Sequence, residues 1–167
     1  MINKTVICPG TFDPITNGHI DLIRRGSLLF AQVFIAITEE SKKSLTFSIT
    51  ERKNMVEQIF KNYNNIKVYT FTGLLIDFAK SKNIKIILRG LRSIFDMQYN
   101  AQLAYFNKLM CNDIETVFLI SDNKYVNISS SMVKEIADIG GDISRLVPNE
   151  IHSFIRDTIV HRKKLKL

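Results

Sequence analysis

The stretch Pro9–Ile23, "PGTFDPITNGHIDLI", directly follows the apolar run "TVIC" at residues 5–8. It holds two prolines and two glycines, which interrupt a continuous helix or strand and therefore predict a shaped loop. The chain has only three histidines and three prolines in 167 residues, yet one histidine and two prolines fall here. We interpret the stretch as a loop that leaves a strand and enters a helix for a functional reason.

Short apolar runs rich in β-branched residues alternate with longer segments of helical periodicity along the whole chain. The runs predict five strands, at 5–8, 33–38, 66–70, 84–89 and 116–120. The other segments predict helices near 18–30, 49–63, 74–82, 95–111, 130–139 and 149–161. Ser48 and Glu51 form an S-x-x-E capping box at the start of the second helix. This alternation predicts an α/β fold, a five-stranded parallel sheet with helices on both faces.

Length and composition indicate one domain, residues 1–167, which at 46% hydrophobic can bury a real core. No apolar run approaches the ~18 residues of a membrane span, and "MINKTVICPG" is too polar for a signal peptide. We therefore expect a cytoplasmic protein without a membrane partner. Cys8 and Cys111 are too few for a disulfide framework or a zinc site.

The net charge of +7 is unevenly spread along the chain. Residues 156–167 hold five basic residues and one acidic residue, which leaves +3 for the other 155 residues. Such a basic C-terminal tail, from about 156, is most often a solvated end. A nucleic-acid-binding module is an alternative, but no alternation of aromatic and basic residues supports it, so we expect no nucleic-acid partner.

Three unusual stretches follow predicted strands: the opening loop, "LRGLRS" at 88–93 and "NISSSMVKE" at 127–135. The carboxyl ends of parallel strands meet at one edge of a sheet, where α/β proteins bind their ligands. The three stretches therefore predict one composite site.

Neither standard nucleotide loop, G-x-G-x-x-G or G-x-x-x-x-G-K-[ST], occurs in the chain, which argues against hydride transfer on a nicotinamide and P-loop hydrolysis. The opening loop instead offers Thr11 and then Asn17, Gly18 and His19 at a helix start. A helix N-terminus presents unpaired N–H groups and a partial positive charge, so it can hold a phosphate, and His19 could add a donor. Alternatively, Asn17 caps the helix and His19 is an ordinary surface residue.

Arg89 and Arg92 flank Gly90, a residue that lets a backbone approach a ligand closely. Their guanidiniums suit bidentate phosphate contacts, although both arginines could instead pair with Asp96 or other acids. The serines at 129–131 could cap the following helix, or present hydroxyl and N–H groups to a second phosphate. No histidine or acid is spaced to activate one of them as a nucleophile.

Together these pieces resemble a known family. "PGTFDPITNGHIDLI", the paired lysines followed by F-x-I-x-E-R, "GLLIDFA", "ILRGLRS" and "ISSSMVKEIA" have the order and spacing of the bacterial phosphopantetheine adenylyltransferases, from Thr5 to about Ile155. T-x-G-H at 16–19 marks the wider nucleotidyltransferase superfamily, and "PGTFDP" with "RGLR" narrows the resemblance to this family. The resemblance implies a dinucleotide-binding (Rossmann-like) fold, a homohexamer, and Mg²⁺-dependent transfer of the adenylyl group of ATP to 4'-phosphopantetheine. A related nucleotidyltransferase acting on another phosphate substrate is the alternative.

The resemblance also implies roles for individual residues. The catalytic residues would be His19, Lys43 and Arg92, with Lys42 the alternative to Lys43, and Mg²⁺ would be held through the ATP phosphates. Phosphopantetheine would be bound by Thr11, Lys43, Leu75 and Arg89. ATP would be bound by Thr11, Phe12, His19, Gly90, Leu91, Arg92, Asn100, Tyr125, Val126, Asn127, Ile128, Ser129, Ser130 and Ser131. This chain departs from the usual D-F-E-Y-E at 96–100, where Asn100 replaces a glutamate.

Overall fold

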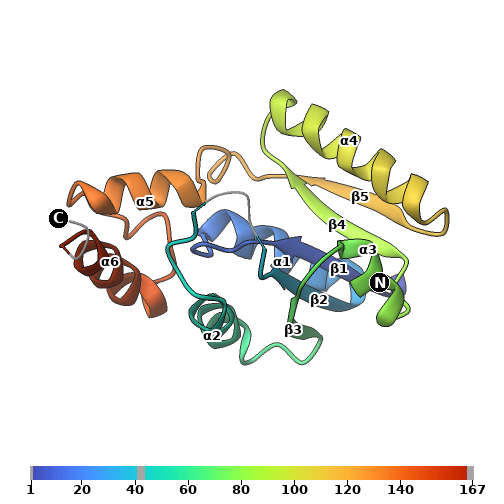
Figure 1. The fold of residues 1–167 in the computed structure, drawn as a ribbon, viewed down its shortest axis with the longest axis horizontal. Coiled ribbons are helices and arrows are strands. Elements are labelled where there is room, and N and C mark those ends of the chain that lie inside the picture. The colour runs from blue at the N-terminus through green and yellow to red at the C-terminus, as the bar shows by residue number, and fades with distance from the viewer. Residues whose placement is uncertain (1, 41–43, 165–167) are drawn as a thin grey trace.

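The computed structural model describes residues 2–40 and 44–164, which form a parallel five-stranded sheet with its helices (Figure 1). The strand order is β3-β2-β1-β4-β5, so the first strand lies in the centre. The strands are β1 (Ile2–Gly10), β2 (Phe30–Thr38), β3 (Ile66–Phe71), β4 (Ile86–Leu91) and β5 (Glu115–Ile120). The helices are α1 (Asn17–Leu29), α2 (Ile49–Phe60), α3 (Leu75–Ser81), α4 (Ile94–Met110), α5 (Ser130–Asp138) and α6 (Asn149–Lys164).

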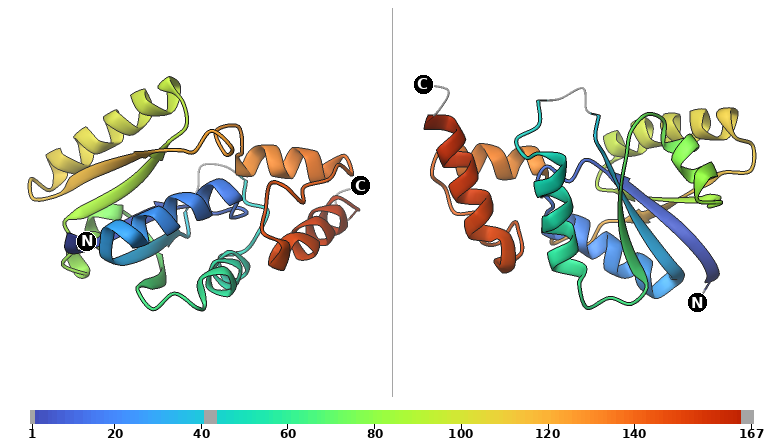
Figure 2. Two further views of the ribbon diagram at one scale, coloured as in Figure 1. Left: turned by 180° about the vertical axis from the view of Figure 1, so that it is seen from behind. Right: turned by 60° about the horizontal axis from the view of Figure 1, so that its bottom comes forward.

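The two faces of the sheet bury separate hydrophobic clusters, because successive residues of a strand point to opposite faces. Val6 and Cys8 of β1 belong to a cluster with apolar side chains of α1, α2, α5 and α6. Ile7, between them, belongs to a second cluster with α3. The parallel sheet with helices on both faces is therefore confirmed, and Figure 2 shows the layers from two further directions.

At the centre of the sheet, the carboxyl ends of β1 and β4 are not paired with each other. β1 pairs with β4 at Ile7 and Ile87, whereas β1 pairs with β2 as far as Gly10 and Ile37. Pro9, which has no N–H to donate to a neighbour, lies just beyond the β1–β4 pair. The chain order also reverses between β1 and β4, which is the position where open α/β sheets bind their ligands.

The fourth strand ends later than the sequence predicted. Gly90 and Leu91 pair with Leu119 and Ile120 of β5, so β4 extends to Leu91. Arg89 therefore lies within the strand, and only the end of the "LRGLRS" stretch follows it. A Cβ at Gly90 would lie 3.1 Å from Leu22 Cδ2 of α1, so packing against that helix is one reason for a glycine here.

Two helices beyond the sheet connect its carboxyl edge with the C-terminus, where α5 and α6 lie side by side (Figures 1 and 2). The basic segment from about 156 is part of α6 as far as residue 164. Arg162 Nη2 lies 2.8 and 2.9 Å from the two carboxylate oxygens of Glu51, at the start of α2. Within residues 2–40 and 44–164, no helix combines the length and the apolarity that crossing a membrane requires.

Candidate active site

The start of α1 is a reciprocal cap formed by Thr16 and His19. The Thr16 hydroxyl accepts from the His19 backbone N–H at 3.5 Å, and the Thr16 backbone N–H donates to His19 Nδ1 at 3.1 Å. Because Nδ1 accepts a backbone proton, the neutral ring carries its own proton on Nε2. The alternative in which Asn17 caps the helix is wrong, because Thr16 is the N-cap residue and the Asn17 side chain instead donates to the Arg145 carbonyl at 3.0 Å.

His19 is a half-buried residue rather than an ordinary surface one. Its ring meets the edge of the Phe12 ring with 5.1 Å between the centroids. Burial lowers the pKa of His19, and the positive charges of Arg92 and Arg89 lower it further, to about 4. At pH 7 the ring is therefore neutral, with an Nε2–H that can donate a hydrogen bond.

Arg89 reaches from β4 towards α4 without an acidic partner. Its Nε donates to Asn100 Oδ1 at 2.8 Å and its Nη1 to the Pro9 carbonyl at 3.4 Å. Among the described residues, no carboxylate lies within 4.0 Å of its guanidinium, so the alternative of an acid-paired arginine is wrong for Arg89. Burial lowers the pKa of Arg89 from its ordinary value.

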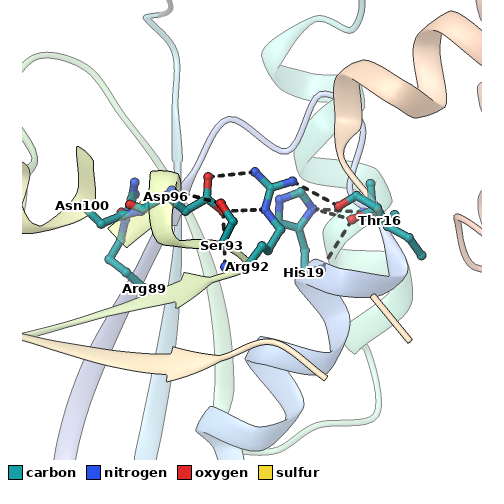
Figure 3. A network of polar contacts seen from close by, with 8 residues as sticks. Thr16, His19, Arg89, Arg92, Ser93, Asp96 and Asn100 are labelled. Carbon is teal, nitrogen blue, oxygen red and sulfur yellow. Dashed lines mark hydrogen bonds and ion pairs between the residues drawn. The ribbon is translucent and has the colours of Figure 1, made fainter. Parts of the chain in front are cut away.

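Arg92, by contrast, forms the ion pair that the sequence offered as its alternative. Its Nε lies 2.9 Å from Asp96 Oδ2, and its Nη1 donates to the Ile128 carbonyl at 3.3 Å. Figure 3 shows Arg92 beside the His19 ring, between that ring and Asp96. An ion pair between partly exposed groups is worth only ~0–1 kcal/mol, so this pairing leaves Arg92 able to meet an incoming anion.

The segment from Tyr125 to Ser131 brings the turn after β5 to the opening loop. Ser129 caps α5 by accepting from the Met132 backbone N–H at 3.1 Å, and the Ser130 hydroxyl donates to the Pro14 carbonyl at 2.7 Å. Tyr125 lies against Gly18, where an added Cβ would be 3.5 Å from Tyr125 Cβ. The other four members differ in exposure: Val126 and Ile128 are half-buried, whereas Asn127 and Ser131 are exposed.

The remaining described residues of the expected site lie at the same edge of the sheet. Thr11 and Phe12 follow β1, and Phe12 is buried with a φ of 50°, in the left-handed region. Leu91 ends β4, and Leu75 begins α3, where it packs against the second hydrophobic cluster. Lys43 and its alternative Lys42 lie outside the described residues.

Asp13 is a buried member of the opening loop that the sequence analysis did not single out. Its Oδ1 accepts from the Phe47 backbone N–H at 2.8 Å, and its Oδ2 lies 2.7 Å from Lys134 Nζ of α5. Thr46 also donates its N–H to this carboxylate, at 3.1 Å. Asp13 thus holds the opening loop, the segment before α2 and the start of α5 together.

Arg52 of α2 is a second buried residue with the same kind of role. It is 1% exposed, and its donors meet backbone carbonyls: Nη1 binds those of Thr11 and Thr38 at 2.8 Å, and Nε binds that of Phe47 at 3.1 Å. A buried charge is costly unless it is fully hydrogen-bonded, and these carbonyls satisfy it. Arg52 could have been found from the sequence by its place in the F-x-I-x-E-R motif. Asp13 stands in "GTFDP", but the sequence does not indicate its partners, which are 33 or more residues away.

The assembled edge is suited to binding anions. The N-termini of α1 and α5 meet where the Ser130 hydroxyl binds the Pro14 carbonyl, Arg92 lies beside them through its bond to the Ile128 carbonyl, and each helix start carries a partial positive charge. Within the described ranges, no group of three or more His, Cys, Asp and Glu residues could hold a metal ion. Phosphate groups are the ligands that this combination of donors favours.

Comparison with known proteins agrees with this geometry. A family model described as cytidylyltransferase-like matches residues 7–136, a range that includes the opening loop, Arg89, Arg92 and the segment from Tyr125 to Ser131. A solved structure, Plasmodium falciparum nicotinic acid mononucleotide adenylyltransferase complexed with NaAD, superposes with a TM-score of 0.67 at 18% identity and covers 96% of both chains. This likeness concerns the fold alone. The fold and the site define a nucleotidyltransferase of the cytidylyltransferase-like class.

Relatives with similar sequences identify the family within this class. The phosphopantetheine adenylyltransferase of Vesicomyosocius okutanii is 46% identical over 155 residues, which cover 93% of this chain and 98% of the relative. The phosphopantetheine adenylyltransferase of Alkaliphilus metalliredigens is 46% identical over 145 residues, which cover 87% of this chain and 92% of the relative. The chain belongs to the phosphopantetheine adenylyltransferase family.

Proposed function

We propose that the chain transfers the adenylyl group of ATP to 4'-phosphopantetheine, giving dephospho-coenzyme A and pyrophosphate. The observation that carries this proposal is the anion-binding edge where His19, Arg89 and Arg92 meet the N-termini of α1 and α5. The relatives that share nearly half of its residues over nine-tenths of its length carry that activity in their name. A cytoplasmic location is part of the same proposal.

The reaction needs no general base. An oxygen of the phosphopantetheine phosphate attacks the α-phosphorus of ATP, a new P–O bond forms, and the bond between the α-phosphorus and the bridging oxygen to the β-phosphate breaks. The nucleophile is already an anion, so no proton has to be removed from it. The protein therefore acts by bringing two highly charged groups into line and by stabilising the charge that develops.

On the ATP side, His19 is proposed to act as a neutral hydrogen-bond donor. Its Nδ1 is occupied by the Thr16 backbone N–H, which leaves the Nε2–H to donate to a phosphate oxygen. A pKa of about 4 makes the free ring a poor proton acceptor at pH 7, which supports a donor role. Arg92 would exchange part of its contact with Asp96 for the phosphates. The other proposed ATP contacts are Thr11, Phe12, Gly90, Leu91, Asn100 and the segment from Tyr125 to Ser131.

On the acceptor side, Arg89 is proposed to bind the phosphate of phosphopantetheine. It is half-buried and reaches the Pro9 carbonyl at the carboxyl end of β1, without an ion-pair partner among the described residues. Thr11 and Leu75, which follow β1 and β3, would line the rest of the site. Lys43 would offset the repulsion between the two phosphates, with Lys42 as the alternative.

Mg²⁺ is proposed to enter with ATP, where it would neutralise charge on the phosphates. The carboxylates near the site, Asp96 and Asp13, are each in an ion pair, and the described residues offer no group of three or more His, Cys, Asp and Glu residues as a ligand set for this hard cation. We therefore assign the ion to the ATP phosphates.

A homohexamer is proposed as the assembly. Helix α4 exposes a row of large apolar side chains, and such contiguous apolar surfaces commonly mark interfaces. The row consists of Ile94, Met97, Tyr99, Tyr105, Phe106, Leu109 and Met110. Light scattering on the eluting protein should give six times the 19.2 kDa chain mass, and Leu109→Glu should lower that mass. A monomeric wild-type protein would contradict the proposal.

The activity is tested by pyrophosphate release from ATP and Mg²⁺ with a panel of acceptors. We expect release with 4'-phosphopantetheine, and none with pantetheine, which lacks the attacking phosphate. Nicotinic acid mononucleotide serves as an alternative acceptor, because the structural neighbour is a nicotinic acid mononucleotide adenylyltransferase. Faster turnover with that acceptor would assign this chain to a different substrate.

A further inference from the structure

Asn100 of α4 is a buried amide in contact with the proposed phosphate-binding arginine. It is 7% exposed, and both halves of its amide are used. Its Oδ1 accepts from Arg89 Nε at 2.8 Å, and its Nδ2 donates to the Asp96 carbonyl at 2.8 Å (Figure 3). The second bond holds the amide with its oxygen towards Arg89, so Asn100 fixes the direction of the guanidinium.

The groups that are hydrogen-bonded to Arg89 orient its guanidinium and are neutral. Asp96 is the nearby carboxylate, and its charge acts on Arg89, but its ion pair is with Arg92, whose Nε lies 2.9 Å from Asp96 Oδ2. Cys8 lies close enough to act on Arg89, but burial raises the pKa of the Cys8 thiol to about 12, so it carries no charge at pH 7. The other hydrogen-bond acceptor of Arg89 is a neutral carbonyl, that of Pro9.

A half-buried guanidinium that lacks a countercharge attracts an anion more strongly than one already in an ion pair. We propose that Asn100 is a positioning residue that aims Arg89 at the acceptor phosphate without forming an ion pair with it. Asn100 acts through Arg89, and this role is separate from the ATP contact proposed for Asn100 above. The inference rests on the proposed role of Arg89.

Two substitutions separate orientation from charge. Asn100→Asp keeps an oxygen for Arg89 Nε and adds a negative charge, whereas Asn100→Ala removes the oxygen and stays neutral. Both lose the bond to the Asp96 carbonyl, and Asn100→Asp also places an oxygen against that carbonyl, an effect that the Arg89→Ala background below measures separately. If Asn100 served only as a hydrogen-bond acceptor, Asn100→Asp would be the milder change. We expect the opposite order, with the KM for 4'-phosphopantetheine raised about tenfold by Asn100→Asp and about threefold by Asn100→Ala.

A spectroscopic measurement gives a readout that a merely structural role would not move. The charges of Arg92 and Arg89 act on His19, so a carboxylate placed against Arg89 should raise the pKa of His19. An NMR titration of the histidine ring protons should show this rise in Asn100→Asp and a smaller change in Asn100→Ala. The resonance of His19 is identified by its absence in His19→Gln.

The outcomes distinguish this inference from the proposed role of Arg89. If Arg89→Ala leaves the KM for 4'-phosphopantetheine unchanged, the proposed phosphate role of Arg89 fails. If Arg89→Ala raises that KM but Asn100→Asp does not, the inference about Asn100 is overturned and the role of Arg89 stands. In an Arg89→Ala background, Asn100→Asp should add less than twofold, because the charge on which it acts is gone. A full additional tenfold loss there would also overturn the inference.

Discussion

The low pKa of His19 makes the stability of this protein depend on pH in a direction that can be calculated. An unfolded histidine takes up a proton below about pH 6.5, whereas folded His19 stays neutral until about pH 4. Between these values the unfolded state binds more protons, so the free energy of unfolding falls as the pH falls. Each pH unit in that window is worth about 1.4 kcal/mol, which gives about 3 kcal/mol over the whole window.

His19→Gln is the variant that isolates this effect. Glutamine at the third position of a helix can accept from the backbone N–H of the cap residue, so the reciprocal cap with Thr16 can be kept. The glutamine side chain cannot take up a proton, however, so the stability of the variant lacks this pH dependence. We expect wild type to be as stable as His19→Gln or more so at pH 7, and to lose about 3 kcal/mol relative to the variant by pH 4.

The assay is chemical denaturation of both proteins at several pH values between 7 and 4, in phosphate-free buffer and at one protein concentration. Fixed concentration is required because association contributes to apparent stability. His152 and His161 are present in both proteins, so their titration cancels in the difference. Parallel stability curves for the two proteins, or a His19 NMR titration midpoint near 6.5, would refute the reasoning.

Three further predictions concern the rest of the site. Lys134→Met should lower the free energy of unfolding by about 2 kcal/mol, because it leaves the buried Asp13 carboxylate without its cation. Chemical denaturation measures this loss, and an unchanged midpoint would show that the ion pair does not contribute to stability. Lys43→Ala should abolish most pyrophosphate release while Lys42→Ala retains it; the reverse pattern would move the role to Lys42. Arg92→Ala should raise the KM for ATP about tenfold or more with little loss of stability, since its ion pair is partly exposed; a lower melting temperature with a normal KM would make Arg92 structural instead.

The order and type of the elements could be predicted from the sequence because their signals are local. Apolar β-branched runs, helical periodicity and the Ser48–Glu51 capping box act over a few residues, and the box forms as expected, with the Ser48 N–H 2.7 Å from Glu51 Oε2. The general placement of the site also followed, since the loops after parallel strands must meet at one edge of the sheet. The end of β4 was missed because Gly90 looks like a loop residue until its pairing with Leu119 is known.

Only the tertiary structure decided the partners of the charged and polar groups. Asp13 meets Lys134 across 121 positions of sequence, and Arg89 meets Asn100 rather than a carboxylate. Asp96 pairs with one of the two arginines that the sequence could not tell apart. The direction of a side chain and the loss of water around it depend on residues that are distant in the chain, and these two quantities set pKa values and charge compensation. For this reason the sequence named His19 and Arg89 as candidates, whereas only the folded chain shows a neutral His19 ring and an Arg89 guanidinium without an ion-pair partner among the described residues, the two features on which their proposed phosphate contacts rest.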